Sequence, residues 1–128
     1  MSINEFKNIK ILFVEDEDNI RINATSYLKR LFDEVYEAKD AFEAFEIIEY
    51  KKPHIIITDI NMPQMSGLEL SQRLKSIPSV RQKPILALTT ENSAEIKQAG
   101  KEIGIAGWVV KPFSNDKIVM AIKKVLGT

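Results

Sequence analysis

The sequence predicts a doubly wound α/β fold, with a five-stranded parallel sheet in the strand order 2-1-3-4-5 and helices on both faces. Three observations predict it. Five short apolar runs alternate with five helical patterns along the chain. The chain has 128 residues, of which 45% are hydrophobic, enough for one core of ordinary size. No repeat, low-complexity tract or linker divides it, so we expect a single domain over residues 1–128.

Strands are predicted where apolar residues run together between turn residues. Such runs are typical of parallel strands, because both faces of those strands are buried. The stretch "PHIIITD" shows the pattern, with His54 before the run and Asp59 after it. The second run, "EVYEA", is the least apolar. The five predicted strands cover residues 9–14, 34–38, 54–58, 84–88 and 107–110.

Helices are predicted between the strands, where apolar residues recur three or four apart behind a capping residue. Asp18, Asp40 and Ser114 are the expected N-caps of the first, second and fifth helices, and Ser66 precedes the third. Gly127 follows the last helix, as a C-terminal glycine does. The apolar stripes of these four helices are Ile20, Ala24, Tyr27, Leu28 and Leu31; Ala41, Ala44, Phe45 and Ile48; Leu68, Leu70, Leu74 and Ile77; and Ile118, Ala121, Ile122 and Val125.

The fourth helix, "SAEIKQAGKEIG", is predicted to be the most weakly held. Its only apolar anchors are Ala94, Ile96, Ala99 and Ile103. Gly100 lies inside it, and glycine in a helix interior costs about 1 kcal/mol relative to alanine. We therefore expect this helix to be a moving part of the domain.

Charge and composition exclude several classes of function. Eighteen basic residues balance eighteen acidic ones, so no overall field attracts nucleic acid or an anionic membrane. The absence of cysteine excludes disulfides, thiolate metal sites and thiol nucleophiles. The N-terminus lacks the apolar core of a signal peptide, and no segment approaches the roughly 18 residues of a membrane span. We expect a cytoplasmic monomer that binds neither a membrane nor, directly, nucleic acid.

Polar residues follow the predicted strands at the end where ligands bind in open parallel sheets. Glu15 and Asp16 follow the first strand and Asp59 follows the third. Thr89 follows the fourth strand, and Lys111 follows the fifth. In the order 2-1-3-4-5, these strands are neighbours. Three carboxylates, a hydroxyl and an ammonium are therefore expected to face one crevice.

Three carboxylates this close repel one another, by about 1 kcal/mol per pair at ~4 Å in water and about 4 at an effective dielectric of 20. A cation is needed to offset the repulsion. Oxygen-only ligands with room for water suit Mg²⁺, which we expect as the cofactor. A carboxylate beside that ion can attack phosphorus and form an acyl phosphate. Asp59 is the predicted nucleophile.

The motifs "ILFVEDED", "IIITDINMPQMSG", "ILALTTE" and "GWVVKPF" resemble, in this order, those of the response-regulator receiver domain, whose fold is flavodoxin/CheY-like. The resemblance covers about residues 9–126. It implies that Asp59 accepts a phosphoryl group from the phosphohistidine of a histidine kinase. It implies that Asp16, Asp59 and the main-chain carbonyl of Asn61 hold Mg²⁺, with Glu15 acting through water. Many members carry Asp where this chain has Glu15, which changes the reach of that side chain.

The resemblance also implies roles at the ends of the last two strands. Thr89 and Lys111 would bind the oxygens of the acyl phosphate, and the bond from Lys111 to Pro112 would be cis. The protein would be a signalling module rather than an enzyme, catalysing only its own phosphorylation and dephosphorylation. Asn61 and Glu91 would flank the phosphate and tune its hydrolysis.

Within the family, the chain looks most similar to the stand-alone chemotaxis type, with Trp108 in place of the aromatic switch residue. Phosphorylation would draw Thr89 inward and vacate space beneath Trp108, which in such relatives moves from exposed to buried. The face of the fourth helix, fifth strand and fifth helix would then change shape. A flagellar motor switch protein or a phosphatase is the implied partner. A phosphorelay histidine phosphotransferase and a separate output protein are the alternatives.

Most of these residues also have a purely structural reading. Asp59 could cap the turn in "DINMPQMSG", and the acidic residues 15–18 could begin a helix, where they suit its dipole. Trp108 could be an edge aromatic that is permanently packed. His54, the only histidine, lies five residues before Asp59, or about 16 Å at ~3.3 Å per residue. We therefore interpret it as a strand-entry residue and not as a phosphodonor.

Three other function classes share parts of the pattern. A flavodoxin-type electron carrier needs a hydroxyl- and glycine-rich phosphate loop, where this chain has the acidic "VEDEDN". A phosphohydrolase of the haloacid dehalogenase type has a second Asp two residues after the nucleophile, and position 61 is Asn. A DNA-binding regulator would need a basic recognition helix, and none stands out.

Overall fold

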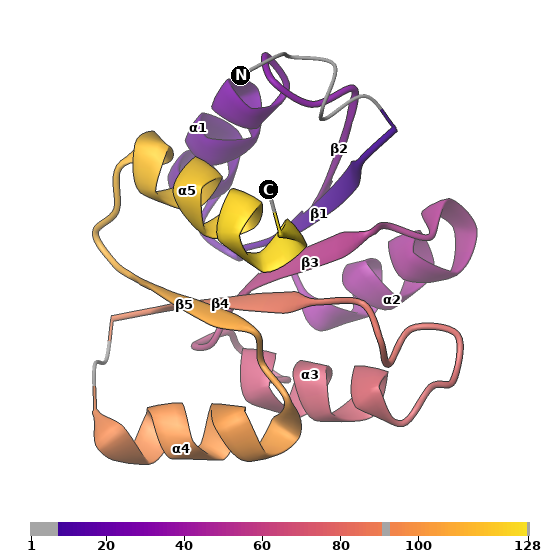
Figure 1. Cartoon of the computed structure of the whole chain (residues 1–128), viewed down its shortest axis with the longest axis vertical. Helices are drawn as coiled ribbons and strands as arrows, with labels where there is room; N and C mark the ends of the chain where they lie inside the picture. Colours follow the sequence, from indigo (N-terminus) through magenta and orange to yellow (C-terminus); the bar gives the residue numbers. More distant parts are fainter. Residues whose placement is uncertain (1–7, 91–92, 128) are drawn as a thin grey trace.

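The computed structural model describes residues 8–90 and 93–127, and within them strands and helices alternate throughout (Figure 1). The strands are β1 (Lys10–Val14), β2 (Glu34–Ala38), β3 (Ile55–Asp59), β4 (Ile85–Thr89) and β5 (Gly107–Val110). The helices are α1 (Asp18–Leu28), α2 (Ala41–Lys51), α3 (Gly67–Lys75), α4 (Ala94–Ile103) and α5 (Asn115–Leu126). None of these helices is long and apolar enough to cross a bilayer.

The strands form one parallel sheet in the order β2-β1-β3-β4-β5, which confirms the predicted topology. Helices α1 and α5 cover one face, and α2, α3 and α4 lie on the other (Figure 1). Successive residues of each central strand therefore enter different cores. In β1, Leu12 packs toward α2 and α3, whereas Phe13 packs toward α1 and α5. This alternation explains why the strands read as continuous apolar runs.

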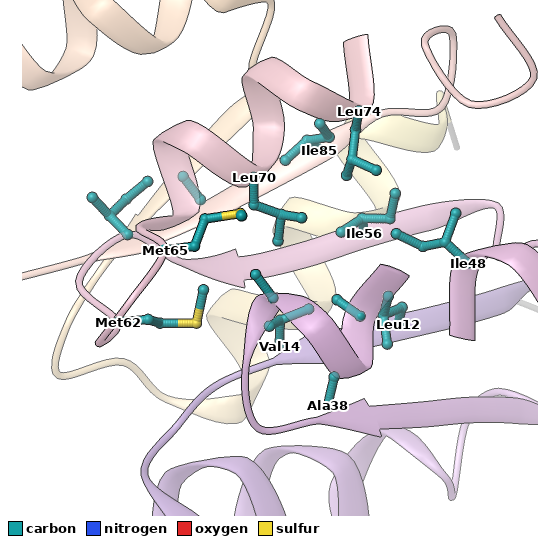
Figure 2. Close-up of a cluster of buried hydrophobic side chains, with 14 of the residues drawn as sticks. Leu12, Val14, Ala38, Ile48, Ile56, Met62, Met65, Leu70, Leu74 and Ile85 are labelled. Carbon is teal, nitrogen blue, oxygen red and sulfur yellow. The ribbon is translucent and has the colours of Figure 1, made fainter. Parts of the chain in front are cut away.

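The core on the α2 and α3 side reaches the carboxyl edge of the sheet. Figure 2 shows Val14 and Ile56 from the strands meeting Leu70 and Leu74 from α3. The loop between β3 and α3 adds two buried methionines, Met62 and Met65. These close-packed side chains fix the end of β3 and thereby position Asp59, the last residue of the strand.

Two of the three predicted helix caps, Asp40 and Ser114, are confirmed, and Ser66 also caps its helix. Asp40, Ser66 and Ser114 each accept a hydrogen bond from the backbone N–H three residues on. The prediction for Asp18 is wrong, because Glu17 is at the N-cap and makes no side-chain cap bond, while Asp18 is the first helical residue. The Asp18 carboxylate instead accepts a hydrogen bond at 2.7 Å from the Arg21 guanidinium.

Strands β2 and β5 have the predicted ends, and the other strands differ from the prediction by one residue. Leu31 and Ile77 lie beyond the ends of α1 and α3, although both still pack against the cores. Ala94 is exposed, so the prediction that it anchors α4 is wrong. His54 precedes β3, as predicted for a strand-entry residue. Its backbone N–H donates to the carbonyl of Lys10, and its Nδ1 accepts from the Lys10 N–H at 2.9 Å.

Candidate functional site

The acidic residues of the two central strands meet at the carboxyl edge of the sheet. β1 and β3 are neighbours, with Val14 opposite Thr58, so the loop after β1 lies beside the end of β3. Glu15, Asp16 and Asp59 each offer a carboxylate oxygen within 4.8 Å of the others. Glu15 and Asp59 are 1% and 3% exposed, whereas Asp16 is open to solvent. The predicted convergence of three carboxylates is therefore present.

A lysine from the far side of the sheet completes the cluster. β4 pairs with β3 and with β5, and Lys111, just after β5, donates its backbone N–H to the Thr89 carbonyl at 2.8 Å. The Lys111 ammonium lies 2.6 Å from Glu15 Oε1 and 3.1 Å from Asp59 Oδ2. The peptide bond from Lys111 to Pro112 is cis, as predicted. The ammonium bridges the acids of two separate strands.

The electrostatics of this cluster are set by burial and by the ion pairs. Burial raises the pKa of Glu15 to about 7, and Asp59 adds to the rise, while Lys111 and the Glu17 N–H oppose it. Burial alone would lower the pKa of Lys111, but its bonds to Glu15 and Asp59 outweigh burial and raise it. Among the described residues, Lys111 thus pairs with two of the three carboxylates, those of Glu15 and Asp59.

The acidic set fits a hard divalent cation. Glu15 Oε1 is buried, forms an ion pair with Lys111, and has no hydrogen-bond partner among the described residues. The three acids supply only oxygen ligands, and exposed Asp16 leaves one side open to water. Oxygen ligands with room for water are what Mg²⁺ prefers.

The remaining predicted residues lie around this cluster. Thr89 is buried at the end of β4. Asn61 is exposed, and its N–H approaches Asp59 Oδ1 at 3.4 Å, so the turn contact considered for Asp59 exists alongside its ion pair. Trp108 is half-buried and packs against the core on the α3 side of the sheet. Glu91 lies outside the described residues.

A family model for the response regulator receiver domain matches residues 11–123. The chain belongs to this family. The assignment of the four strand-end motifs to a receiver domain is thereby confirmed, together with the (βα)5 fold. A receiver domain is a signalling module of two-component systems and implies a histidine kinase as partner.

Solved structures and curated relatives place this receiver domain among several kinds of regulator. It superposes on two structures of the chemotaxis response regulator CheY4 of Vibrio cholerae, with TM-scores of 0.85 and 0.88 and identities of 36% and 37%, covering 91% of this chain and 98% of those chains. It is 33% identical over 117 residues to the transcriptional regulatory protein SrrA of Staphylococcus aureus, covering 91% of this chain. It spans 47% of the length of that relative.

The structure also adds a residue to the receiver site that the sequence pattern did not single out. The Arg21 guanidinium of α1 donates to the carbonyl of Glu15 at 2.9 Å and binds Asp18 and Glu37. Its side chain is 12% exposed. Arg21 therefore ties the backbone of the acidic loop, at Glu15, to helix α1. Only its spacing of three from Asp18 could have signalled this, and that spacing is common on helix surfaces.

A cavity of about 410 Å³ adjoins the acidic cluster between α1 and the loop after β5. Ile20, Ala24 and Phe113 supply apolar walls, and Thr90 and Lys111 line its polar side. Lys111 thus faces both the buried acids and this opening.

Proposed function

We propose that Asp59 is the phosphoacceptor of this receiver domain and takes its phosphoryl group from a phosphohistidine of a histidine kinase. The observation that carries this proposal is the position of the Asp59 carboxylate. It ends a buried strand, lies 3.1 Å from the Lys111 ammonium and shares its crevice with two further acids. A nucleophilic carboxylate needs this kind of charge compensation where negative charge develops.

In the proposed step, a carboxylate oxygen of Asp59 attacks the phosphorus of the donor. A P–O bond forms, the P–N bond of the phosphohistidine breaks, and the leaving imidazole nitrogen keeps the electron pair and takes a proton from solvent. Lys111 neutralises charge on the transferred oxygens, and the Thr89 hydroxyl donates to one of them. Positioning and electrostatics supply the catalysis, as is general for phosphoryl transfer.

Mg²⁺ is the proposed cofactor of this transfer. Asp16, Asp59 and the main-chain carbonyl of Asn61 would hold the ion, with Glu15 acting through water. When bound, it neutralises the charge of the carboxylates and of the incoming phosphoryl group. The three acidic side chains within 4.8 Å of one another and the solvent-facing side at Asp16 support this assignment.

We assign the output to the face made by α4, β5 and α5. Val110 on β5 and Met120 on α5 are exposed, at 39% and 68%, which supports an apolar contact with a partner there. Trp108 is the proposed switch residue, and Asn61 and Glu91 are proposed to tune hydrolysis of the acyl phosphate. The domain is proposed to act as a cytoplasmic monomer.

A chemotaxis role is the output we favour, with a flagellar motor switch protein or a phosphatase as partner. The similarity to CheY4 over nearly all of that chain supports it. The similarity to SrrA supports the alternative, a receiver acting in a phosphorelay or on a separate output protein. A pull-down with and without a phosphate mimic separates the two by the partner captured. Binding that ignores the mimic would contradict a switch.

Incubation with a small acyl phosphate and Mg²⁺, followed by intact mass, tests the acceptor. The parent should gain one phosphoryl group and Asp59→Asn none. Asp33→Asn, at an exposed acid away from the cluster, is the matched control and should be modified like the parent. Full modification of the Asp59→Asn variant would refute the assignment.

A further inference from the structure

The buried position of helix α4 is occupied by a glycine, which is unusual in a helix interior. Of its residues, Ala94–Ile103, only Gly100 is buried. The apolar side chains of Ile96, Ala99 and Ile103 are half-buried, and the other residues of the helix are exposed. The most buried position of this helix is therefore one that has no side chain.

The space over Gly100 is filled by the indole of Trp108. A Cβ built on Gly100 would lie 2.2 Å from Cζ2 and 2.8 Å from Cη2 of that ring, and 3.3 Å from Cδ1 of Ile105. Real Cβ atoms essentially never lie within 3.0 Å of another heavy atom. An alanine would therefore require the ring to move, and the ring is confined by the core on the α3 side.

The backbone does not explain this glycine. Gly100 has ordinary helical geometry and is not among the residues with positive φ. Glycine inside a helix is unfavourable by about 1 kcal/mol relative to alanine. What glycine uniquely provides here is the room for an aromatic ring.

We propose that Gly100 is a positioning residue that seats the Trp108 indole, so that the location of α4 against β5 is set by where this ring lies. The packing part of the inference stands alone, and the signalling part rests on the proposed phosphorylation of Asp59. If the Trp108 ring moved away from Gly100, α4 would be released, and the face that it forms with β5 and α5 would change.

The connections around the seat favour this coupling. The carbonyl of Gly100 accepts the N–H groups of Gly104 and Ile105, both at 2.9 Å, which closes the last turn of α4. The next residue, Ala106, donates to the carbonyl of Ile85 in β4. The C-terminal end of α4 is thus fixed to the sheet through the backbone, and the ring is the second tie. Without the ring, α4 would keep this backbone connection and its packing against α3.

The ring is also close along the chain to the acidic cluster. Trp108 lies opposite Ala87 in the β4–β5 ladder, and Val110 lies opposite Thr89. Lys111 follows directly and binds Asp59. A displacement of Thr89 or Lys111 is therefore separated from the Trp108 indole by only one or two residues of β5.

A double-mutant cycle tests the seat without phosphorylation. In a Trp108→Leu background, which lacks the outer indole atoms, Gly100→Ala should raise the folded-to-unfolded ratio about fivefold, as helix propensity predicts. In the Trp108 background the same change should lower the ratio, and the emission of this single tryptophan should shift to the red as its ring leaves the seat. Lys97→Ala, at an exposed position of the same helix, should have the same effect in both backgrounds. An equal effect of Gly100→Ala in both backgrounds, with unchanged emission, would overturn the proposal.

The signalling part needs a second measurement on the full chain. Gly100→Ala and the parent are treated with a small acyl phosphate and Mg²⁺, and intact mass, tryptophan emission and amide hydrogen exchange of α4 are followed. We expect equal modification of Asp59, with the exchange of α4 already fast before phosphorylation in the variant and its response to phosphorylation lost. An undiminished response in the variant would overturn the coupling. No modification of the parent would instead contradict the proposed function, and the stability cycle would still decide the seat.

Discussion

Replacing Asp59 by Asn should make the domain more stable when no metal ion is bound, although it removes the proposed acceptor. The amide has the shape of the carboxylate and keeps an oxygen for the N–H of Asn61. What it removes is one negative charge from a cluster of three. The sign of the effect depends on whether that charge is held more strongly by Lys111 than it is repelled by Glu15 and Asp16.

The distances give the magnitude. At an effective dielectric of 20, the Lys111 ammonium at 3.1 Å attracts the Asp59 charge by about 5 kcal/mol. Repulsion from Glu15 and Asp16, each at 4.8 Å or less, is at least about 3.5 kcal/mol apiece, or about 7 together. The difference favours the neutral amide by about 2 kcal/mol. The cost of burying a charged carboxylate acts in the same direction.

Urea unfolding in the presence of a chelator measures the effect. The pH is set well above 7, the approximate pKa of Glu15, so that the Glu15 carboxylate is charged. Asp33→Asn is the control, and its effect should stay within about 0.5 kcal/mol as for an exposed surface change. Added Mg²⁺ should then stabilise the parent more than the Asp59→Asn variant, because only the parent keeps the full ligand set.

A clear loss of stability in Asp59→Asn without metal, beside an unchanged control, would refute this reasoning. It would show that the ion pair with Lys111 outweighs the repulsion among the acids. The cluster would then be a structural ion-pair network that needs no cation. Equal stabilisation of parent and variant by Mg²⁺ would show that Asp59 is not a ligand.

Three further changes follow from the contacts. Burial, with Lys83 and Lys10 nearby, lowers the pKa of His54 below its ordinary 6.5, so the folded state binds fewer protons at this group than the unfolded state does. The His54 contribution to stability should therefore fall as pH drops below about 6.5, opposite in sign to that of Glu15, and the difference in unfolding free energy between the parent and a His54→Asn variant should show it. Ser114→Ala should cost about 1 kcal/mol in thermal unfolding, because it removes the N-cap of α5. Arg21→Gln should weaken Mg²⁺ binding about tenfold in a tryptophan-emission titration, because it releases the acidic loop.

The fold could be predicted because its pattern is local. Buried parallel strands require apolar residues on both faces, and residues such as Leu12 and Phe13 serve opposite cores. The meeting of Glu15, Asp16 and Asp59 followed from strand order alone, since neighbouring parallel strands end at one edge.

Other features depend on contacts between distant residues and could not be predicted. Asp18 has a side chain that is common at helix N-caps, but its carboxylate accepts a hydrogen bond from Arg21, one turn later in the helix, and does not cap the backbone. Ala94 has the spacing of an anchor, but no core lies beneath it. Gly100 could be predicted only as a residue of low helix propensity, whereas its contact with the Trp108 ring required the packing of β5 against that helix.

Two local choices in this chain oppose stability, and both bear on the proposed switch. Buried carboxylates repel one another at the end of β3, and a glycine occupies the interior of α4. Conflicts between local preference and the whole fold are expected at functional sites. The β4–β5 ladder joins the two, with Thr89 opposite Val110 and Ala87 opposite Trp108. In the proposed switch, charge added at Asp59 would therefore be transmitted to α4 through a few residues of β4 and β5.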